Sequence, residues 1–297
     1  MAAQQATHGD RSHITVLGLG QMGRALAEAL LSAGYRTTVW NRTTGKADTL
    51  VGKGALRADS VSDAIAASPL VIVCVGDYDG VHEVLDGSVA EIRGRTLLNL
   101  TTGTPDEAQA VAAWAAGHGA DYLDGAMMAV PQTVASPDAF FLYSGSAAAF
   151  ETHRDVLDVL ATSYYLGTDA AAAELWDLAL LSSGYAALTG FLHGAALLDT
   201  ADVAPSAFLP LATRWLHGMI AFMSELADEA ESRDYTTGVS PVAMNQVAVA
   251  KLAHVSHSRG VSTDIHAPLQ ALLGQRVADG HGTDSFASVF ELLRKQS

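Results

Sequence analysis

The sequence predicts an N-terminal α/β domain, a long helix after it, and an all-helical C-terminal domain. Between His13 and Gly167, short runs rich in β-branched residues alternate with helical patterns, which is typical of βαβ units and a mostly parallel sheet. After Gly167 the strand signals fade, and Ala- and Leu-rich segments of helical period follow. We therefore divide the chain into a tail (1–12), an α/β domain (13–167), a connecting helix (168–199) and a helical domain (200–297).

The first half carries the signals for its strands and helices. The clearest helix is predicted at 105–118, because Thr104 can cap it, Pro105 suits its first position and Glu107 completes a capping box. The strands are apolar or β-branched runs bounded by turn-forming residues. We expect strands at 14–17, 35–40, 69–75, 95–100, 120–123 and 140–144, and helices at 21–33 and 105–118.

The second half is predicted to be helical throughout. Its first helix, of about 30 residues, would span about 45 Å and is apolar around much of its circumference, so we expect burial on several sides, in part by a partner subunit. Polar residues such as Asp177 and His193 interrupt the apolar stretch, which favours a buried helix over a membrane span. The expected helices are 170–199, 205–233, 241–258, 265–279 and 283–294.

The composition indicates an acidic protein of a reducing compartment. The 297 residues include 32 acidic and 17 basic side chains, for a net charge of −15, which argues against a nucleic-acid partner. The single Cys74 lies in an apolar run, where we expect a buried strand residue, and it has no partner for an intramolecular disulfide. The first 12 residues lack the apolar core of a signal peptide. We expect a cytoplasmic protein without a membrane partner.

The motif Gly18-Leu19-Gly20-Gln21-Met22-Gly23 follows the first predicted strand and opens the first helix. In that position the spacing is typical of a dinucleotide-binding, Rossmann-type turn. Gly18 permits the tight turn, Gly20 lets a pyrophosphate approach the backbone, and Gly23 allows close packing of helix on strand. A purely structural glycine-rich turn is the alternative.

The end of the second predicted strand favours NADP over NAD. NAD-binding proteins usually carry Asp or Glu there for the ribose hydroxyls, but this chain has Trp40-Asn41-Arg42-Thr43-Thr44. Arg42 can stack near the adenine and bind a 2′-phosphate, with Asn41 and Thr43 adding hydrogen bonds and Lys46 one turn further on. The alternative is that Arg42 is an ordinary surface cation.

Two further loops are expected at the carboxyl ends of parallel strands, where ligands bind in open α/β sheets. They are Val75-Gly76-Asp77-Tyr78 and Asn99-Leu100-Thr101-Thr102-Gly103. We expect Val75, Asn99 and Thr101 to lie at the nicotinamide half of the cofactor. Asn, Thr and Gly are also ordinary turn residues, so a purely structural role remains open.

The order of these motifs resembles that of the imine reductases and reductive aminases, relatives of the β-hydroxyacid dehydrogenases that reduce C=N bonds with NADPH. The matching segments are GLGQMG, VWNRT, NLTTGTP and, most specifically, ELWDLALL at 174–181. The resemblance covers nearly the whole chain from His13. It implies NADPH as cofactor, an imine or a carbonyl plus amine as substrate, and a domain-swapped homodimer whose active sites are shared between subunits.

Two departures weigh against hydroxyacid chemistry. The β-hydroxyacid dehydrogenases carry a catalytic Lys on the central helix, whereas the matching position here is Asp177 and the Lys residues beyond Lys53 are Lys251 and Lys295. The Ser-Gly-Gly substrate loop expected after Asp124 is replaced by Gly-Ala-Met-Met-Ala.

Asp177 is the predicted catalytic residue. Leu175, Trp176 and Leu178 surround it in sequence, and burial raises the pKa of an Asp, so a neutral carboxyl could protonate the imine nitrogen as hydride reaches the carbon. A charged Asp177 would instead stabilise an iminium cation. The alternative is an Asp that faces solvent or pairs with an Arg.

Tyr185 is the second catalytic candidate, on the strength of the family resemblance. It lies about 80° around the helix and about 12 Å along it from Asp177, so we expect no direct contact, although both side chains could face one cavity. The alternative is a core aromatic residue with a satisfied hydroxyl.

The resemblance also places Trp215, Met219, Met244 and Asn245 near the substrate, although Met and Trp at helical spacing are more often plain core. No metal site is expected, because the eleven His residues form no metal-binding helix motif.

The sequence thus predicts an NADPH-dependent oxidoreductase that reduces imines or iminium ions to amines, with reductive amination of carbonyls as an extension. Two alternatives stay open: a β-hydroxyacid dehydrogenase, and a non-catalytic NADPH-binding sensor or scaffold.

Overall fold

A computed structural model describes residues 12–294, so the predicted tail lies outside the described residues except for Ser12. The chain divides by compactness into two units, Met1–Leu181 and Ser182–Ser297. The division falls inside the long helix α7 (Ala171–Asp199). Each unit is described by itself below.

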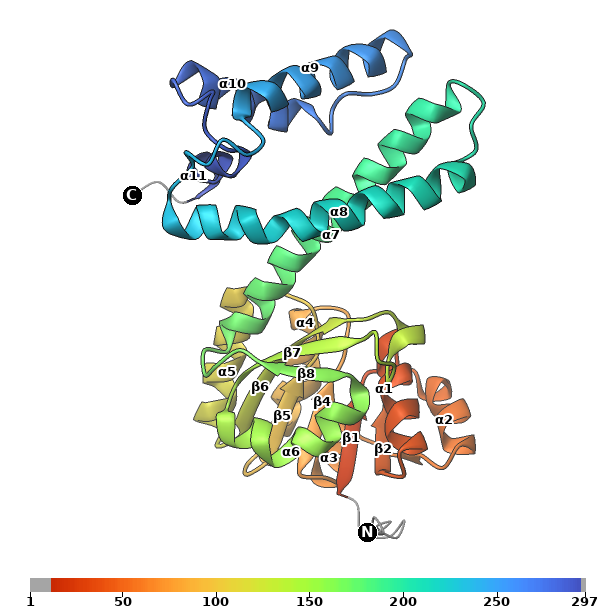
Figure 1. Cartoon of the computed structure of the whole chain (residues 1–297). Coiled ribbons are helices and arrows are strands. Elements are labelled where there is room, and N and C mark those ends of the chain that lie inside the picture. Colours follow the sequence, from red (N-terminus) through yellow and green to blue (C-terminus); the bar gives the residue numbers. More distant parts are fainter. Residues whose placement is uncertain (1–11, 295–297) are drawn as a thin grey trace, which may run out of the picture. The chain divides into compact units, whose positions relative to one another are not determined.

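The first unit is built on one eight-stranded sheet, with strand order β3-β2-β1-β4-β5-β6-β7-β8 (Figure 1). Neighbouring strands are parallel except for β6 and β7, which pair antiparallel. The strands are β1 (His13–Leu17), β2 (Arg36–Trp40), β3 (Leu56–Arg57), β4 (Leu70–Val73), β5 (Thr96–Asn99), β6 (Asp121–Met128), β7 (Phe140–Gly145) and β8 (Thr162–Tyr165).

Helices cover both faces of this sheet, so the central strand β4 is apolar on both sides. Along β4, Leu70 and Ile72 join the core layer beneath α1 (Gln21–Ser32) and α6 (Ala147–Leu160), while Val71 and Val73 join the opposite layer. That second layer packs against α3 (Val61–Ala66), α4 (Tyr78–Leu85) and α5 (Pro105–Gly117). A short helix α2 (Asp48–Gly52) completes the unit.

The predicted strands and the two predicted helices of this unit are present, including the Thr104 capping box of α5. Cys74 is buried as expected, but it follows β4 rather than lying in it. The strand predicted at 120–123 extends to Met128, because its second half pairs with β7. Helix α6 and strand β8 were not predicted. Strand β8 adds a strand parallel to β7 at the edge of the sheet.

The second unit is helical, as predicted. It comprises the rest of α7 with α8 (Pro205–Ser232), α9 (Val242–Ser258) and α10 (Ala267–Ala278). The helix predicted at 283–294 is instead a 3₁₀ turn (Phe286–Val289) followed by the single turn α11 (Phe290–Leu293). A small core of Val242, Leu273 and Val289 joins α9, α10 and this last segment.

Most of α7 is exposed in the single chain, so the predicted burial would depend on a partner subunit and stays a prediction. Leu188 and Leu192 are 61% and 65% exposed, because residues 12–294 provide no second layer of side chains over them. Within residues 12–294, α7 is also the one helix whose length and hydropathy would suit a membrane span. Only 6% of its most apolar window is buried, so its apolar surface requires a separate explanation.

Candidate active site

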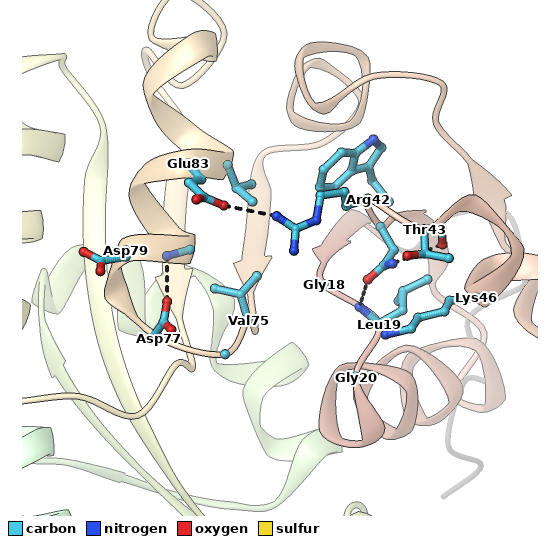
Figure 2. Close-up of a pocket in the computed structure, with 15 residues that line it drawn as sticks. Gly18, Leu19, Gly20, Arg42, Thr43, Lys46, Val75, Asp77, Asp79 and Glu83 are labelled. Atoms are coloured by element: carbon cyan, nitrogen blue, oxygen red, sulfur yellow. Dashed lines mark hydrogen bonds and ion pairs between the residues drawn. The ribbon is translucent and has the colours of Figure 1, made fainter.

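The loops that follow β1, β2 and β4 line a cleft of about 610 Å³ (Figure 2). These strands are neighbours, and the order of the sheet reverses between β1 and β4, so their carboxyl ends meet at a topological switch point. The cleft is lined by Gly18, Leu19, Gly20, Trp40, Asn41, Arg42, Thr43, Lys46, Val75, Gly76, Asp77, Asp79, Gly80, Glu83 and Val84.

The three motif glycines have the geometry that a dinucleotide turn requires. Gly18 has a φ of 95°, and a Cβ there would lie 2.2 Å from the carbonyl oxygen of Cys74. A Cβ on Gly23 would lie 2.0 Å from the carbonyl oxygen of Gly18, so helix and strand pack closely only with glycine. Gly20 instead borders open space. The α1 N-terminus is therefore accessible to a phosphate, which fits a dinucleotide.

Asn41 holds the glycine turn against the end of β2. Its Oδ1 accepts a hydrogen bond from the Leu19 amide at 2.9 Å, and its Nδ2 donates to the Thr43 carbonyl at 3.1 Å. The Gly18 amide donates to the Trp40 carbonyl at 3.0 Å. Asn41 thus fixes the two loops that form one wall of the cleft.

Arg42 projects into the cleft and meets a carboxylate on the opposite wall. Its Nη1 lies 3.2 Å from Glu83 Oε2 of α4, and both side chains are largely exposed (Figure 2). Lys46 lies on the same wall as Arg42. An exposed ion pair of this kind contributes little to the stability of the fold, so Arg42 is available to an anionic ligand.

Most of the predicted cofactor residues line this cleft, but five do not: Gln21, Met22, Gly23, Asn99 and Thr101. Asn99 and Thr101 are buried, and their side chains bond within the protein. Asn99 Nδ2 donates to the Tyr122 hydroxyl at 3.2 Å, and Thr101 Oγ1 accepts from the Val75 amide at 3.2 Å. Both side chains are thus engaged within the protein, and their expected position at the nicotinamide half stays a prediction.

The contribution of α4 to the cleft was not predicted. Its residues Asp79, Gly80, Glu83 and Val84 line the cleft. Asp77 caps this helix by accepting a hydrogen bond from the Gly80 amide at 2.8 Å. The signal was present, since Asp followed by a helical pattern after a parallel strand marks a helix N-terminus at the ligand edge.

The first turn of α7 is anchored to the sheet. Ser144 Oγ on β7 accepts a hydrogen bond from the Ala173 amide and donates to the Ala170 carbonyl, both at 3.0 Å. Glu174 Oε2 accepts from the Gly103 amide at 3.1 Å, which ties α7 to the loop after β5. Both Ala173 and Glu174 are fully buried.

Asp177 lies one turn further along α7. It is 4% exposed, although Leu175, Trp176 and Leu178 beside it in the sequence are exposed. Burial raises the pKa of its carboxyl, which favours the neutral acid. Asp177 does not line the cofactor cleft described above.

Tyr185 and the four predicted substrate residues lie in the second unit. Tyr185 is 65% exposed on α7. Trp215 lines a mostly apolar cavity of about 470 Å³ between α7 and α8, and Met219 lies one turn further along α8. Met244 and Asn245 lie on α9, outside that cavity. The amide of Asn245 is engaged by Ser240 and Pro241 at the start of its own helix.

Residues 12–294 contain no group of three His, Cys, Asp or Glu side chains that could hold a metal ion.

Two family models together match nearly the whole chain. Residues 13–167 match the NAD binding domain of 6-phosphogluconate dehydrogenase, and residues 169–295 match the C-terminal domain of NADPH-dependent reductive aminase-like proteins. An NADPH-dependent reductive aminase from Aspergillus oryzae is 40% identical over 287 residues, which cover 95% of this chain and 97% of that protein.

Solved structures agree with this result. A reductive aminase from Aspergillus terreus, in complex with NADPH and ethyl-5-oxohexanoate, matches with a TM-score of 0.91 and 39% identity over 96% of this chain and 100% of the other. An imine reductase from Myxococcus stipitatus, in complex with NADP+, matches with a TM-score of 0.88 and 35% identity over 95% of this chain and 100% of the other.

Proposed function

Because the chain belongs to the family of NADPH-dependent reductive aminases and imine reductases, we propose that it reduces imines or iminium ions to amines with NADPH. Condensation of a carbonyl with an amine before the reduction is a further part of this proposal. The observation that carries it is Asp177, a buried carboxyl with a raised pKa on the helix that begins where the cofactor domain ends.

The cleft holds the cofactor in this proposal. The α1 N-terminus at Gly20 binds the pyrophosphate, while Arg42 and Lys46 bind the 2′-phosphate. Thr43 adds a hydrogen bond on the same wall. NADPH supplies the hydride that reaches the C=N carbon. In this proposal the α/β domain (13–167) binds NADPH, and the connecting helix (168–199) joins it to the helical domain. The helical domain (200–297) serves substrate binding and dimerisation.

Asp177 supplies the proton in this mechanism. Its neutral carboxyl donates to the imine nitrogen while the carbon accepts the hydride, so one proton and one hydride convert C=N to CH–NH. Tyr185 is the second proposed catalytic residue, as a hydrogen-bond donor. Trp215, Met219, Met244 and Asn245 are proposed to surround the hydrocarbon part of the substrate.

The proposed activity predicts that NADPH is consumed when the purified protein is given a cyclic imine such as a 1-pyrroline. A ketone with a primary amine tests reductive amination in the same assay. NADP-dependent oxidation of a small 3-hydroxy acid, without imine reduction, would instead identify a β-hydroxyacid dehydrogenase. Tight NADPH binding without turnover of imines, ketones or hydroxy acids would favour a sensor or scaffold.

We propose that a second copy of the chain covers the exposed apolar surface of α7 and α8 in a domain-swapped homodimer. The set includes Leu175, Trp176, Leu188, Leu192, Leu211, Trp215, Ile220 and Met223, each more than half exposed. Surface of this extent on a soluble chain normally marks an interface. Asp177 and His193 within the same helix disfavour a lipid contact. For the compartment we propose the cytoplasm, consistent with one buried, unpaired Cys74.

Replacing both Leu188 and Leu192 by Asp is expected to convert the dimer to a monomer, because buried carboxylates without partners oppose association. The variant should lose imine turnover and keep NADPH affinity. Molar mass from light scattering is the measurement, and Val51→Asp, at an exposed apolar site on α2, is the matched control. A monomeric wild-type protein at micromolar concentration would contradict the proposed homodimer.

A further inference from the structure

Two buried carboxyl groups, Asp124 on β6 and Glu174 on α7, each leave one oxygen without a partner. Asp124 Oδ1 accepts hydrogen bonds from the hydroxyls of Tyr78 at 2.9 Å and Tyr122 at 2.7 Å, while Oδ2 has none. Glu174 Oε2 accepts from the Gly103 amide, while Oε1 has none. Both side chains are fully buried. A buried carboxylate oxygen without a hydrogen-bond partner destabilises the folded protein, so the two oxygens require an explanation.

The surroundings of this pair contain acids, phenols and the Asn99 side-chain amide, but no cation. The titratable groups that face it are Tyr78 from α4, Tyr122 from β6, Glu107 from α5 and Asp177 from α7. Among the described residues, no Lys, Arg or His contributes to the pKa of either carboxyl. Two buried negative charges without a counter-ion are strongly disfavoured, and retention of one proton removes the repulsion.

The hydrogen bonds indicate which carboxyl holds the proton. Asp124 receives two phenol hydrogen bonds, and the Asn99 amide also favours its anion, whereas Glu174 receives one hydrogen bond from a backbone amide. In agreement, burial raises the pKa of Glu174 to about 7, helped by the charge of Asp124, and the pKa of Asp124 only to about 6. Glu174 is thus the acid and Asp124 the acceptor.

We propose that Glu174 retains a proton at neutral pH and donates it from Oε1 towards Asp124 Oδ2, directly or through one buried water molecule. This single hydrogen bond satisfies both orphaned oxygens. It would fasten the first turn of α7 to β6, as the Gly103 contact fastens it to the loop after β5. Glu174 is then a positioning residue for Asp177, three residues further on, a role that rests on the proposed function.

Loss of this proton has a defined consequence for stability. The folded protein holds the proton up to a higher pH than the unfolded chain, where a Glu has a pKa of about 4.3. The unfolded state therefore binds fewer protons between about pH 4 and pH 7, and the free energy of unfolding falls as the pH rises through that range. Above it the two anions repel across the α7 anchor.

Glu174→Gln is the direct test, because the amide can accept from Gly103 and donate to Asp124 at every pH. The melting temperature of the wild-type protein should fall by several degrees more than that of the variant between about pH 5 and about pH 8. The infrared carbonyl band of a protonated carboxylic acid should be present in the wild type at neutral pH and weaker in the variant. Glu225→Gln, at an exposed site on α8, should match the wild type in both measurements.

Parallel stability profiles of wild type and Glu174→Gln, or an unchanged carboxylic acid band, would overturn the proposed proton. Both measurements use the protein without substrate, so they stand even if imine reduction fails. The positioning role is tested by Glu174→Ala, which should lower kcat for imines at least tenfold with unchanged NADPH affinity. Glu174→Gln should retain the wild-type kcat. Unchanged kcat in Glu174→Ala would overturn that role alone.

Discussion

Replacing Asp177 by Asn is expected to lower the turnover of cyclic imines by about 10²- to 10⁴-fold while NADPH affinity stays nearly constant. Asn fills the same space as Asp but cannot transfer a proton. The side chain lies outside the cofactor cleft, so its loss should leave the binding of NADPH intact. Steady-state kinetics and a fluorescence titration with NADPH measure the two effects separately.

The same variant distinguishes the two roles open to Asp177. An N-alkylated iminium ion needs hydride but no proton, so its reduction should survive Asp177→Asn if Asp177 is a proton donor. It should fall in parallel with imine reduction if the charged carboxylate stabilises the cation. The raised pKa that burial gives Asp177 favours the first outcome.

Asp155→Asn is the matched control for this experiment, because Asp155 is exposed on α6 of the same unit. It should retain wild-type turnover. Unchanged imine turnover in Asp177→Asn would remove Asp177 from the reaction, and equal losses of turnover and NADPH affinity would indicate a structural defect instead.

Replacing Arg42 by Ala is expected to weaken NADPH binding roughly 10- to 100-fold and to leave NADH binding nearly unchanged. Hydrogen bonds to charged groups are worth about 1.5–3 kcal/mol, and Arg42 would make them with a 2′-phosphate that NADH lacks. Isothermal titration with each cofactor gives the ratio of the dissociation constants. That ratio should approach unity in the variant.

Glu83→Gln is a control that should change NADPH affinity in the opposite direction to Arg42→Ala. Glu83 lies 3.2 Å from Arg42 and would repel a 2′-phosphate, so its neutral substitute should bind NADPH as tightly as the wild type or more so. A wild-type NADPH to NADH ratio near unity, or a ratio unaffected by Arg42→Ala, would refute the 2′-phosphate assignment.

The sequence predicted those parts of the fold that depend on short-range patterns. The apolar strands β1, β4 and β5, the glycine turn at 18–23 and the Thr104 cap are local features, and they lie where expected. The segment 147–165 was missed as a helix and a strand. Its edge strand β8 has the mixed pattern Thr-Ser-Tyr-Tyr, with two exposed residues, so it lacks the apolar run of a central strand.

The candidate site was predicted less completely, because its contacts join distant segments. Glu83 reaches Arg42 across the cleft from another crossover helix. Asn99 and Thr101 follow a strand at the ligand edge, yet their side chains turn inwards to Tyr122 and Val75. No role was predicted for Glu174 beyond its place in the family motif at 174–181, because its burial against Gly103 depends on how α7 meets the sheet.

The direct test of the central claim is transfer of a deuterium label from NADPH that carries deuterium at both C4 positions. Incubation of the purified protein with the labelled cofactor and a cyclic imine should yield an amine that carries the deuterium on the former C=N carbon, as mass spectrometry and NMR can show. Failure to form labelled amine from the imine would contradict imine reduction. Deuterium on the carbinol carbon of a 3-hydroxy acid, formed in a parallel incubation with a small 3-oxo acid, would instead identify a β-hydroxyacid dehydrogenase.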